Sequence, residues 1–139
     1  MIIHSRLIIL SALLISGSAL SAQFDTSTAR IILKDYGLAS CISGQFKEDS
    51  EIKSDIDIAI AAYSTMGNGQ HLIMQNEDNL AVIDDPYAAT KKYMLDAYQN
   101  TPAISKYTDK KMAFYGCLEI YNSDEFDKFI KSQDQYLSK

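Results

Sequence analysis

The sequence predicts an all-α protein, a compact bundle of five or six helices, and three observations support this prediction. Apolar residues recur at three- and four-residue steps along most of the chain, which is the spacing of one helix face. No run alternates β-branched and polar residues, and turn dipeptides are rare, so signals for strands are poor. With 139 residues, 47% of them apolar, the chain is long enough to bury one core without a dense set of disulfides.

The first 22 residues have the three-part pattern of a secretory signal peptide. Arg6 supplies the positive start, residues 7–15 form an apolar run, and small residues follow as far as Ala22. The run is well short of the ~20 residues that a membrane-spanning helix needs. We therefore expect cleavage after Ala22, or after Ser21 as the alternative. This leaves a single exported helical domain over residues 23–139, with no membrane attachment once the leader (residues 1–22) is removed.

Two long helices are expected in the first half of this domain. The first should run from about Ala29 to Gly44, with a broad buried face that includes Cys41. Ser54 is the N-cap candidate of the second helix, because a serine side chain can accept a hydrogen bond from the first turn. The glycine-rich segment 67–69 should end this helix, because glycine readily adopts the left-handed geometry found at helix C-termini.

Three further helices are expected in the second half. The pair Asp85-Pro86 is a strong start signal, because aspartate caps a helix and proline suits its first position; this third helix should reach about Gln99. Asp109 should cap the fourth helix and Ser123 the last one. The stretch before the third helix could form either a short helix or an extended piece. Short connections favour antiparallel packing of neighbouring helices.

Cys41 and Cys117 are the only two cysteines, and they lie 76 positions apart. An exported protein meets an oxidising compartment, where an even number of cysteines usually pairs. A bridge that closes a loop of this size removes roughly 4 kcal/mol of unfolded-state entropy in the chain-entropy description. We expect one disulfide that joins the first long helix to the penultimate helix; two buried free thiols are the alternative.

Few residues remain for chemistry once the leader is removed. Taking 22 residues from 139 leaves 117, with 12 basic residues, 18 acidic residues and one histidine, His71. The acidic balance argues against nucleic acid as a partner. One histidine and two paired cysteines supply neither a Cys/His nucleophile pair nor a usual set of metal ligands. Neighbouring acids such as Asp55 and Asp57 could form a glycosidase-type pair, but such acids are usually only solvated. We therefore expect no enzyme activity, no metal and no cofactor.

Two cysteine-bearing segments make the chain resemble a known family. The first is residues 39–42, Ala-Ser-Cys-Ile. The second is residues 115–123, Tyr-Gly-Cys-Leu-Glu-Ile-Tyr-Asn-Ser, and a short amphipathic helix follows it. With the leader and a tyrosine-bearing middle, the chain resembles the periplasmic immunity proteins that neutralise peptidoglycan amidases delivered by type VI secretion. The resemblance implies an all-helical fold, a bridge between Cys41 and Cys117, and frequently a homodimer. It also implies that a helix and a neighbouring loop plug the active-site cleft of a Cys/His amidase in the periplasm.

The acidic stretch from Glu77 to Asp85, with the glycine-rich turn before it, is the candidate plug. Its carboxylates could steer the protein toward a basic rim and speed association. His71 should lie in an exposed turn, either as an ordinary surface histidine or as a contact on a binding loop. The residues that we expect to contact the amidase are Asn68, Gln70, His71, Glu77, Asp78, Asp84, Asp85 and Tyr87.

Two other functions remain open at the level of the sequence. A periplasmic acid-stress chaperone can also be small, helical and equipped with two cysteines; it would expose apolar surface as the pH falls and protect many clients. A helical carrier of a small apolar ligand would be recognised by an internal cavity. An immunity protein would instead bind one partner tightly near neutral pH.

Overall fold

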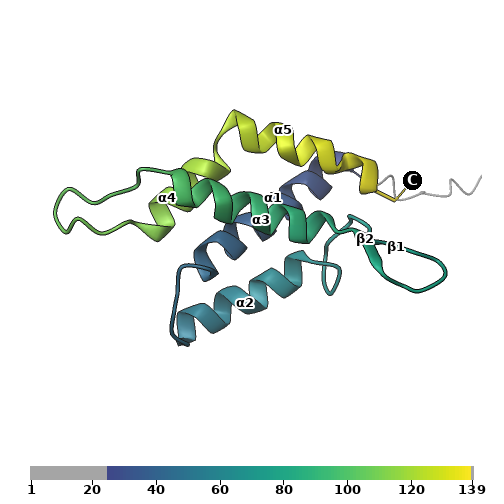
Figure 1. The fold of residues 1–139 in the computed structure, drawn as a ribbon, viewed down its shortest axis with the longest axis horizontal. Helices are drawn as coiled ribbons and strands as arrows, with labels where there is room; N and C mark the ends of the chain where they lie inside the picture. The colour runs from purple at the N-terminus through teal and green to yellow at the C-terminus, as the bar shows by residue number, and fades with distance from the viewer. Residues whose placement is uncertain (1–24, 139) are drawn as a thin grey trace, which may run out of the picture.

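Five α-helices account for most of residues 25–138, the part of the chain that this computed structural model describes (Figure 1). The expected leader and its cleavage site lie outside the described residues. A short 3₁₀ helix, η1, and two short strands complete the secondary structure of the described part. The bounds are α1 Thr26–Ser43, α2 Glu51–Tyr63, β1 Met74–Gln75, β2 Val82–Asp84, α3 Pro86–Asn100, α4 Ala113–Tyr121, α5 Asp124–Ser132 and η1 Gln133–Tyr136.

Helices α1 and α3 form the centre of the fold, and α2 and α5 lie on opposite sides of them (Figure 1). The helices approach closely at Gly37 of α1, where an added Cβ would lie 2.9 Å from Thr90 Cγ2 and 3.0 Å from the Phe126 ring. Leu33, Met94 and Phe126 are fully buried around this crossing. The predicted all-α fold class is therefore confirmed, with five helices around one apolar core.

Three helix starts obey simple capping chemistry. Asp85 accepts hydrogen bonds from the backbone N–H groups of Tyr87 and Ala88 at 2.9 and 3.0 Å, directly before Pro86 at the first helical position. Ser123 caps α5 in the same way. Both predicted caps are confirmed. Asp25, one residue before α1, accepts from Ser27 and caps the first helix.

Two predicted helix starts are wrong. Helix α2 begins one turn earlier than expected, because Ser50 rather than Ser54 accepts the hydrogen bond from the Lys53 N–H. Asp109 does not cap α4; it lies in a loop at a φ of 52°, and the N-cap of α4 is Met112, which makes no side-chain capping bond. Aspartate tolerates the left-handed conformation better than most residues, so the turn uses it instead.

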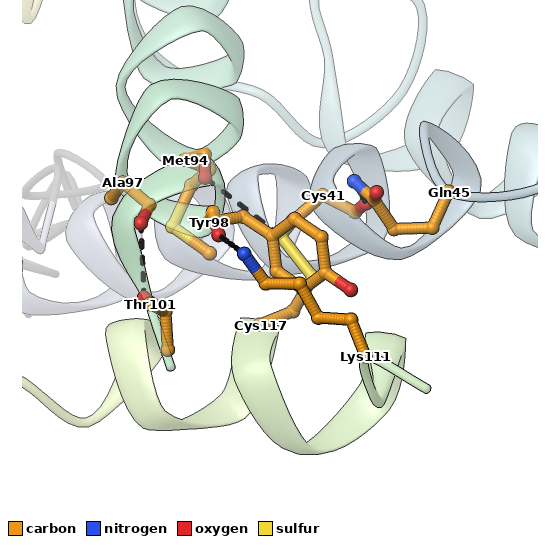
Figure 2. The surroundings of a disulfide bond; sticks show 8 residues. All are labelled: Cys41, Gln45, Met94, Ala97, Tyr98, Thr101, Lys111 and Cys117. Atoms are coloured by element: carbon orange, nitrogen blue, oxygen red, sulfur yellow. Dashed lines mark hydrogen bonds between the residues drawn. A yellow bond between two sulfur atoms is a disulfide. The ribbon is translucent and has the colours of Figure 1, made fainter. Parts of the chain in front are cut away.

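The expected disulfide joins Cys41 of α1 to Cys117 of α4, with 5.9 Å between the two Cα atoms. Both cysteines are 0% exposed, so the bridge is part of the core. Figure 2 shows Met94 and Tyr98 of α3 beside it, with the Lys111 amine directed at the Tyr98 carbonyl oxygen. The bridge therefore fastens α4 to the central pair of helices, and the free-thiol alternative is wrong.

Helix α2 is more exposed than the other described α-helices, each of which has buried residues. It packs on α1, yet none of its residues is fully buried. An open groove of about 320 Å³ lies between α1 and α2, floored by Leu38, Ile42 and Ile56 and flanked by Asp35 and Asp55. None of the described helices is long and apolar enough to cross a membrane.

Candidate protein-binding surface

Residues 72–85, which we call the acidic hairpin, project from one end of the molecule (Figure 1). Strands β1 and β2 pair antiparallel, and the register shifts between Met74 and Gln75. The extended alternative for this stretch is thus correct. A two-stranded ribbon alone is only marginally stable in water, so its turn and its root determine how well it holds its shape.

The turn of the acidic hairpin is ordered by asparagine side chains. The Asn76 amide oxygen accepts hydrogen bonds from the backbone N–H groups of Asp78 and Asn79, at 2.9 and 3.1 Å. The Asn79 amide oxygen accepts from the N–H of Ala81 at 3.0 Å. Such local bonds between asparagine side chains and the backbone define tight turns. The tip therefore has a defined conformation although it projects into solvent.

Leu80 stands in this turn with a φ of 58°, and its side chain is 70% exposed. A left-handed backbone costs a non-glycine residue roughly 1–2 kcal/mol. Such strain persists only where the surroundings enforce it, and it often marks a functional position. Here the enforcing contacts include the bond from the Leu80 N–H to the Asn76 carbonyl oxygen at 2.9 Å. The turn thus holds an apolar side chain out into water.

The acidic hairpin combines charge with exposed apolar surface. Glu77, Asp78 and Asp84 are all exposed on it. The same segment exposes a set of large apolar side chains: Leu72, Met74, Leu80, Val82 and Ile83. Exposed apolar groups gathered on one projection are typical of a protein-binding surface, and the acids around them keep the projection soluble.

The sequence-predicted contact residues fall into two groups. Five of the eight lie on the outer surface or in the acidic hairpin: Asn68, Glu77, Asp78, Asp84 and Asp85. Asp85 is partly buried and caps α3, so it serves the fold as well. Gln70 is half-buried, with its side-chain oxygen enclosed. The four acids among the predicted contacts therefore lie together on the acidic hairpin.

The expectation that His71 lies in an exposed turn is wrong, because its side chain is only 1% exposed. Tyr87 is 3% exposed and packs edge-on against the ring of Tyr36, with the centroids 5.2 Å apart. Both residues are held by packing between the hairpin root and the core. Neither side chain is available to touch a partner in this conformation.

A second projection, residues 101–112, which we call the basic hairpin, connects α3 to α4 (Figure 1). Its arms are joined by the bridge between Ile104 and Lys111 and by the bond from the Ser105 N–H to the Lys110 carbonyl oxygen at 2.9 Å. Tyr107 stands near its tip and is 97% exposed. Sequence reasoning missed this surface because the segment between the third and fourth expected helices carries no alternating strand pattern.

The root of the basic hairpin is anchored at the end of α3. The Lys111 amine donates to the carbonyl oxygens of Tyr98 and Gln99 and lies 4.5 Å from the centre of the Tyr98 ring. A cation at a helix C-terminus is electrostatically favourable. The molecule thus carries two ordered hairpins of opposite charge on its surface, and Figure 1 places them at opposite ends.

Asp57, an acid outside the hairpins that the sequence offered as half of a glycosidase-type pair, is engaged in structural contacts. The Asp57 carboxylate accepts from Lys53 at 2.7 Å and from Ser43 at 2.5 Å, which lower the pKa of Asp57. Within residues 25–138, no group of three or more histidine, cysteine or acidic side chains could hold a metal ion. The described part of the chain defines a class: a small, disulfide-stapled helical protein whose distinctive surfaces are hairpins suited to contact another protein.

Comparison with known families gives this class a name. A family model described as type VI secretion system (T6SS), amidase immunity protein (Tai4) matches residues 31–130. The chain therefore belongs to this family of immunity proteins, which are not enzymes. Its role is immunity to an amidase effector of the type VI secretion system. Comparisons with curated proteins and with solved structures gave no match.

Proposed function

We propose that this protein binds a cognate peptidoglycan amidase in the periplasm and blocks its active-site cleft with the acidic hairpin, which protects the wall of the producing cell. Membership of the amidase immunity family supports the class of partner. The acidic hairpin supports the mode of binding, because it is ordered, projects from the body and presents Leu80 at its tip. The left-handed, exposed Leu80 is the observation that most strongly favours this surface.

A preordered projection is well suited to inhibit an enzyme. Binding costs free energy when loops and side chains must be ordered, so a segment that already has its bound shape binds more tightly. The bonds within the turn supply this order before any partner arrives. An apolar tip with a charged surround also matches the usual plan of an interface, an apolar centre with a polar rim.

The charge of the hairpin should act mainly on the rate of association. Glu77, Asp78 and Asp84 are exposed and lie on one short segment. Like charges gathered on a projection attract a basic rim over several ångströms and raise the association rate, most strongly at low salt. The amidase that fits this protein should therefore carry basic residues around its cleft.

The periplasm is the compartment that fits the covalent structure best. The buried bridge between Cys41 and Cys117 requires an oxidising environment to form, and disulfides are rare in the bacterial cytosol. The expected leader, residues 1–22, supplies the route of export. We also propose, from the family resemblance, that the mature protein forms a homodimer, and the mass of the native protein in solution tests this.

Charge reversal tests the acidic hairpin directly. The triple variant Glu77→Lys/Asp78→Lys/Asp84→Lys changes three exposed side chains and spares Asp85, whose replacement would also remove the cap of α3. We expect association with the cognate amidase to slow about tenfold or more at low salt. Stopped-flow fluorescence or biolayer interferometry, at two salt concentrations, measures this rate.

The matched control carries the same change in net charge at a distance from the hairpin. Glu48→Lys/Asp49→Lys/Glu119→Lys also reverses three exposed acids. We expect this control to retain most of the association rate. If both triple variants slow association equally, net charge alone acts and the acidic hairpin is not the docking surface. An unchanged rate in the hairpin variant would remove it from the interface.

A further inference from the structure

His71 occupies an unusual place for the single histidine of the mature chain. Its side chain is 1% exposed, and the ring nitrogen Nε2 has no hydrogen-bond partner. The Tyr87 ring stands edge-on to it, with the centroids 6.4 Å apart. A buried imidazole without a partner at Nε2 costs less free energy when it is neutral than when it is charged, because the neutral ring carries a single N–H donor and no net charge. The charged form would place a second N–H donor where no acceptor lies.

The last described residues, 133–138, which we call the C-terminal strap, cover this histidine. Leu137 forms a β-bridge with His71, and the Leu72 N–H donates to the Tyr136 carbonyl oxygen at 2.8 Å. Asp134 of the strap forms an ion pair with Arg30 of α1. The strap is thus fastened to the body at one point and to the root of the acidic hairpin at another.

We propose that His71 is a pH-sensitive latch: when its buried ring takes up a proton, the C-terminal strap detaches and the root of the acidic hairpin loosens. The effect on partner binding rests on the proposed function, since it assumes that the acidic hairpin is the contact surface. The latch itself is a property of the free protein. It requires only that the strap covers His71 and that opening the strap lets the charged ring reach water.

The negative charge of Asp134 favours the protonated form of His71, but it does not offset the burial of the ring. Asp134 is the carboxylate that attracts a proton to the ring, but it is already paired with Arg30. Three phenols also lie in this region: Tyr87 from α3, Tyr36 from α1 beyond it, and Tyr136 from the strap. Two carboxylates act on these phenols, Asp85 on Tyr36 and Tyr87 and Asp84 on Tyr136. None of these phenols carries a charge below pH 8 that could offset an imidazolium.

The sign of the pH effect follows from burial. Desolvation lowers the pKa of His71 below its ordinary value, and the charge of Asp134 opposes this only in part. The closed structure therefore binds a proton less well than any opened one does. The closed structure keeps its full stability above pH 6.5 and loses stability as the pH drops below that value. Each pH unit below 6.5 raises the equilibrium constant for opening by up to tenfold.

Amide exchange on the free mature protein, residues 23–139, tests the latch without any partner. The Leu72 amide reports on the contact between strap and hairpin, since its bond is to Tyr136. We expect its protection factor to fall by up to about fivefold between pH 6.5 and pH 5.5, while that of the buried α1 residue Leu33 stays constant. His71 is the only histidine of residues 23–139, so NMR of this protein follows its protonation without ambiguity.

The variant His71→Phe removes the titrating group and keeps a ring of similar size. We expect the Leu72 protection factor of this variant to be independent of pH between 5.5 and 7.5. His71→Gln serves the same purpose if the first variant does not fold. An unchanged protection factor in the wild type, or an equal fall in a folded variant, would overturn the latch.

Binding measurements separate the latch from the proposed function. We expect the wild type to lose affinity for the amidase between pH 7.5 and pH 5.5, and His71→Phe to lose less. The ratio of the two losses should equal the fall in the Leu72 protection factor of the wild type over the same pH range. The amidase itself changes with pH, so the comparison is between the two variants at each pH. If neither protein binds the amidase at pH 7.5, the proposed function fails while the exchange result still decides the latch.

Discussion

The phenol of Tyr87 hydrogen-bonds both backbone polar groups of His71. It accepts from the His71 N–H and donates to the His71 carbonyl oxygen, each at 3.2 Å. Gly69 passes so close to this hydroxyl that an added Cβ would lie 2.2 Å from it. Burial, first of all, raises the pKa of Tyr87, so the phenol keeps its proton and its role as donor. One side chain of α3 thus positions the segment that leads into the acidic hairpin.

Tyr87→Phe should therefore lower stability without removing a surface contact. The ring stays in place, while two buried backbone groups of His71 lose their partner, which we expect to cost about 1–3 kcal/mol of unfolding free energy. Urea unfolding followed by circular dichroism measures this loss. Affinity for the amidase should change little where the variant is folded. The opposite result, unchanged stability with lost affinity, would restore Tyr87 as a contact residue, as the sequence first indicated.

The disulfide yields a prediction about the unfolded chain. Cys41→Ala/Cys117→Ala should lower the unfolding free energy by about 4 kcal/mol, because the bridge closes a loop of 76 positions. Denaturant unfolding of the double variant and of the reduced wild type should agree closely, since both lack the bridge. A double variant as stable as the oxidised protein would show that packing of α1 on α4 already suffices.

The helical part of the fold could be predicted because its signals are local. Asp85-Pro86 fixes the start of α3 and Ser123 the start of α5, each through side-chain or ring chemistry within three residues. The bridge from Cys41 to Cys117 followed from the count of cysteines and the expected compartment. Apolar periodicity then placed most of the buried faces correctly.

The hairpins could not be predicted, because tertiary contacts decide them. The root of the acidic hairpin is paired with the C-terminal strap, which is distant in sequence, through the bond from the Leu72 N–H to the Tyr136 carbonyl oxygen. Burial of His71 depends on the same strap, while its neighbours in sequence, Gln70 and Gly69, read as a turn. Asp109 is a residue type that suits both a helix cap and a left-handed turn, and in the structure it occupies the turn.

Tyr121 should make the protein sensitive to alkali. Burial, together with the bond from its phenol to the Asp35 carboxylate at 3.0 Å, raises the pKa of Tyr121 to about 12. In the unfolded chain the phenol loses its proton near pH 10. The contribution of Tyr121 to the stability of the folded protein is therefore complete below pH 10 and is lost as the pH rises toward 12. The difference in melting temperature between wild type and Tyr121→Phe, measured at pH 8 and pH 11, should shrink at the higher pH.

A final pair of substitutions decides which hairpin contacts the amidase. Leu80→Asn keeps the left-handed turn, because asparagine accepts a φ of 58° more readily than leucine, and it removes the exposed apolar side chain. We expect equal or higher stability and about tenfold weaker binding, the usual cost of losing an apolar anchor at the centre of an interface. Tyr107→Ala removes the exposed aromatic of the basic hairpin and should leave binding unchanged. Isothermal titration against the amidase measures both. The reverse pattern would move the interface to the basic hairpin, and equal losses would mean that the amidase contacts both ends, through one copy or two.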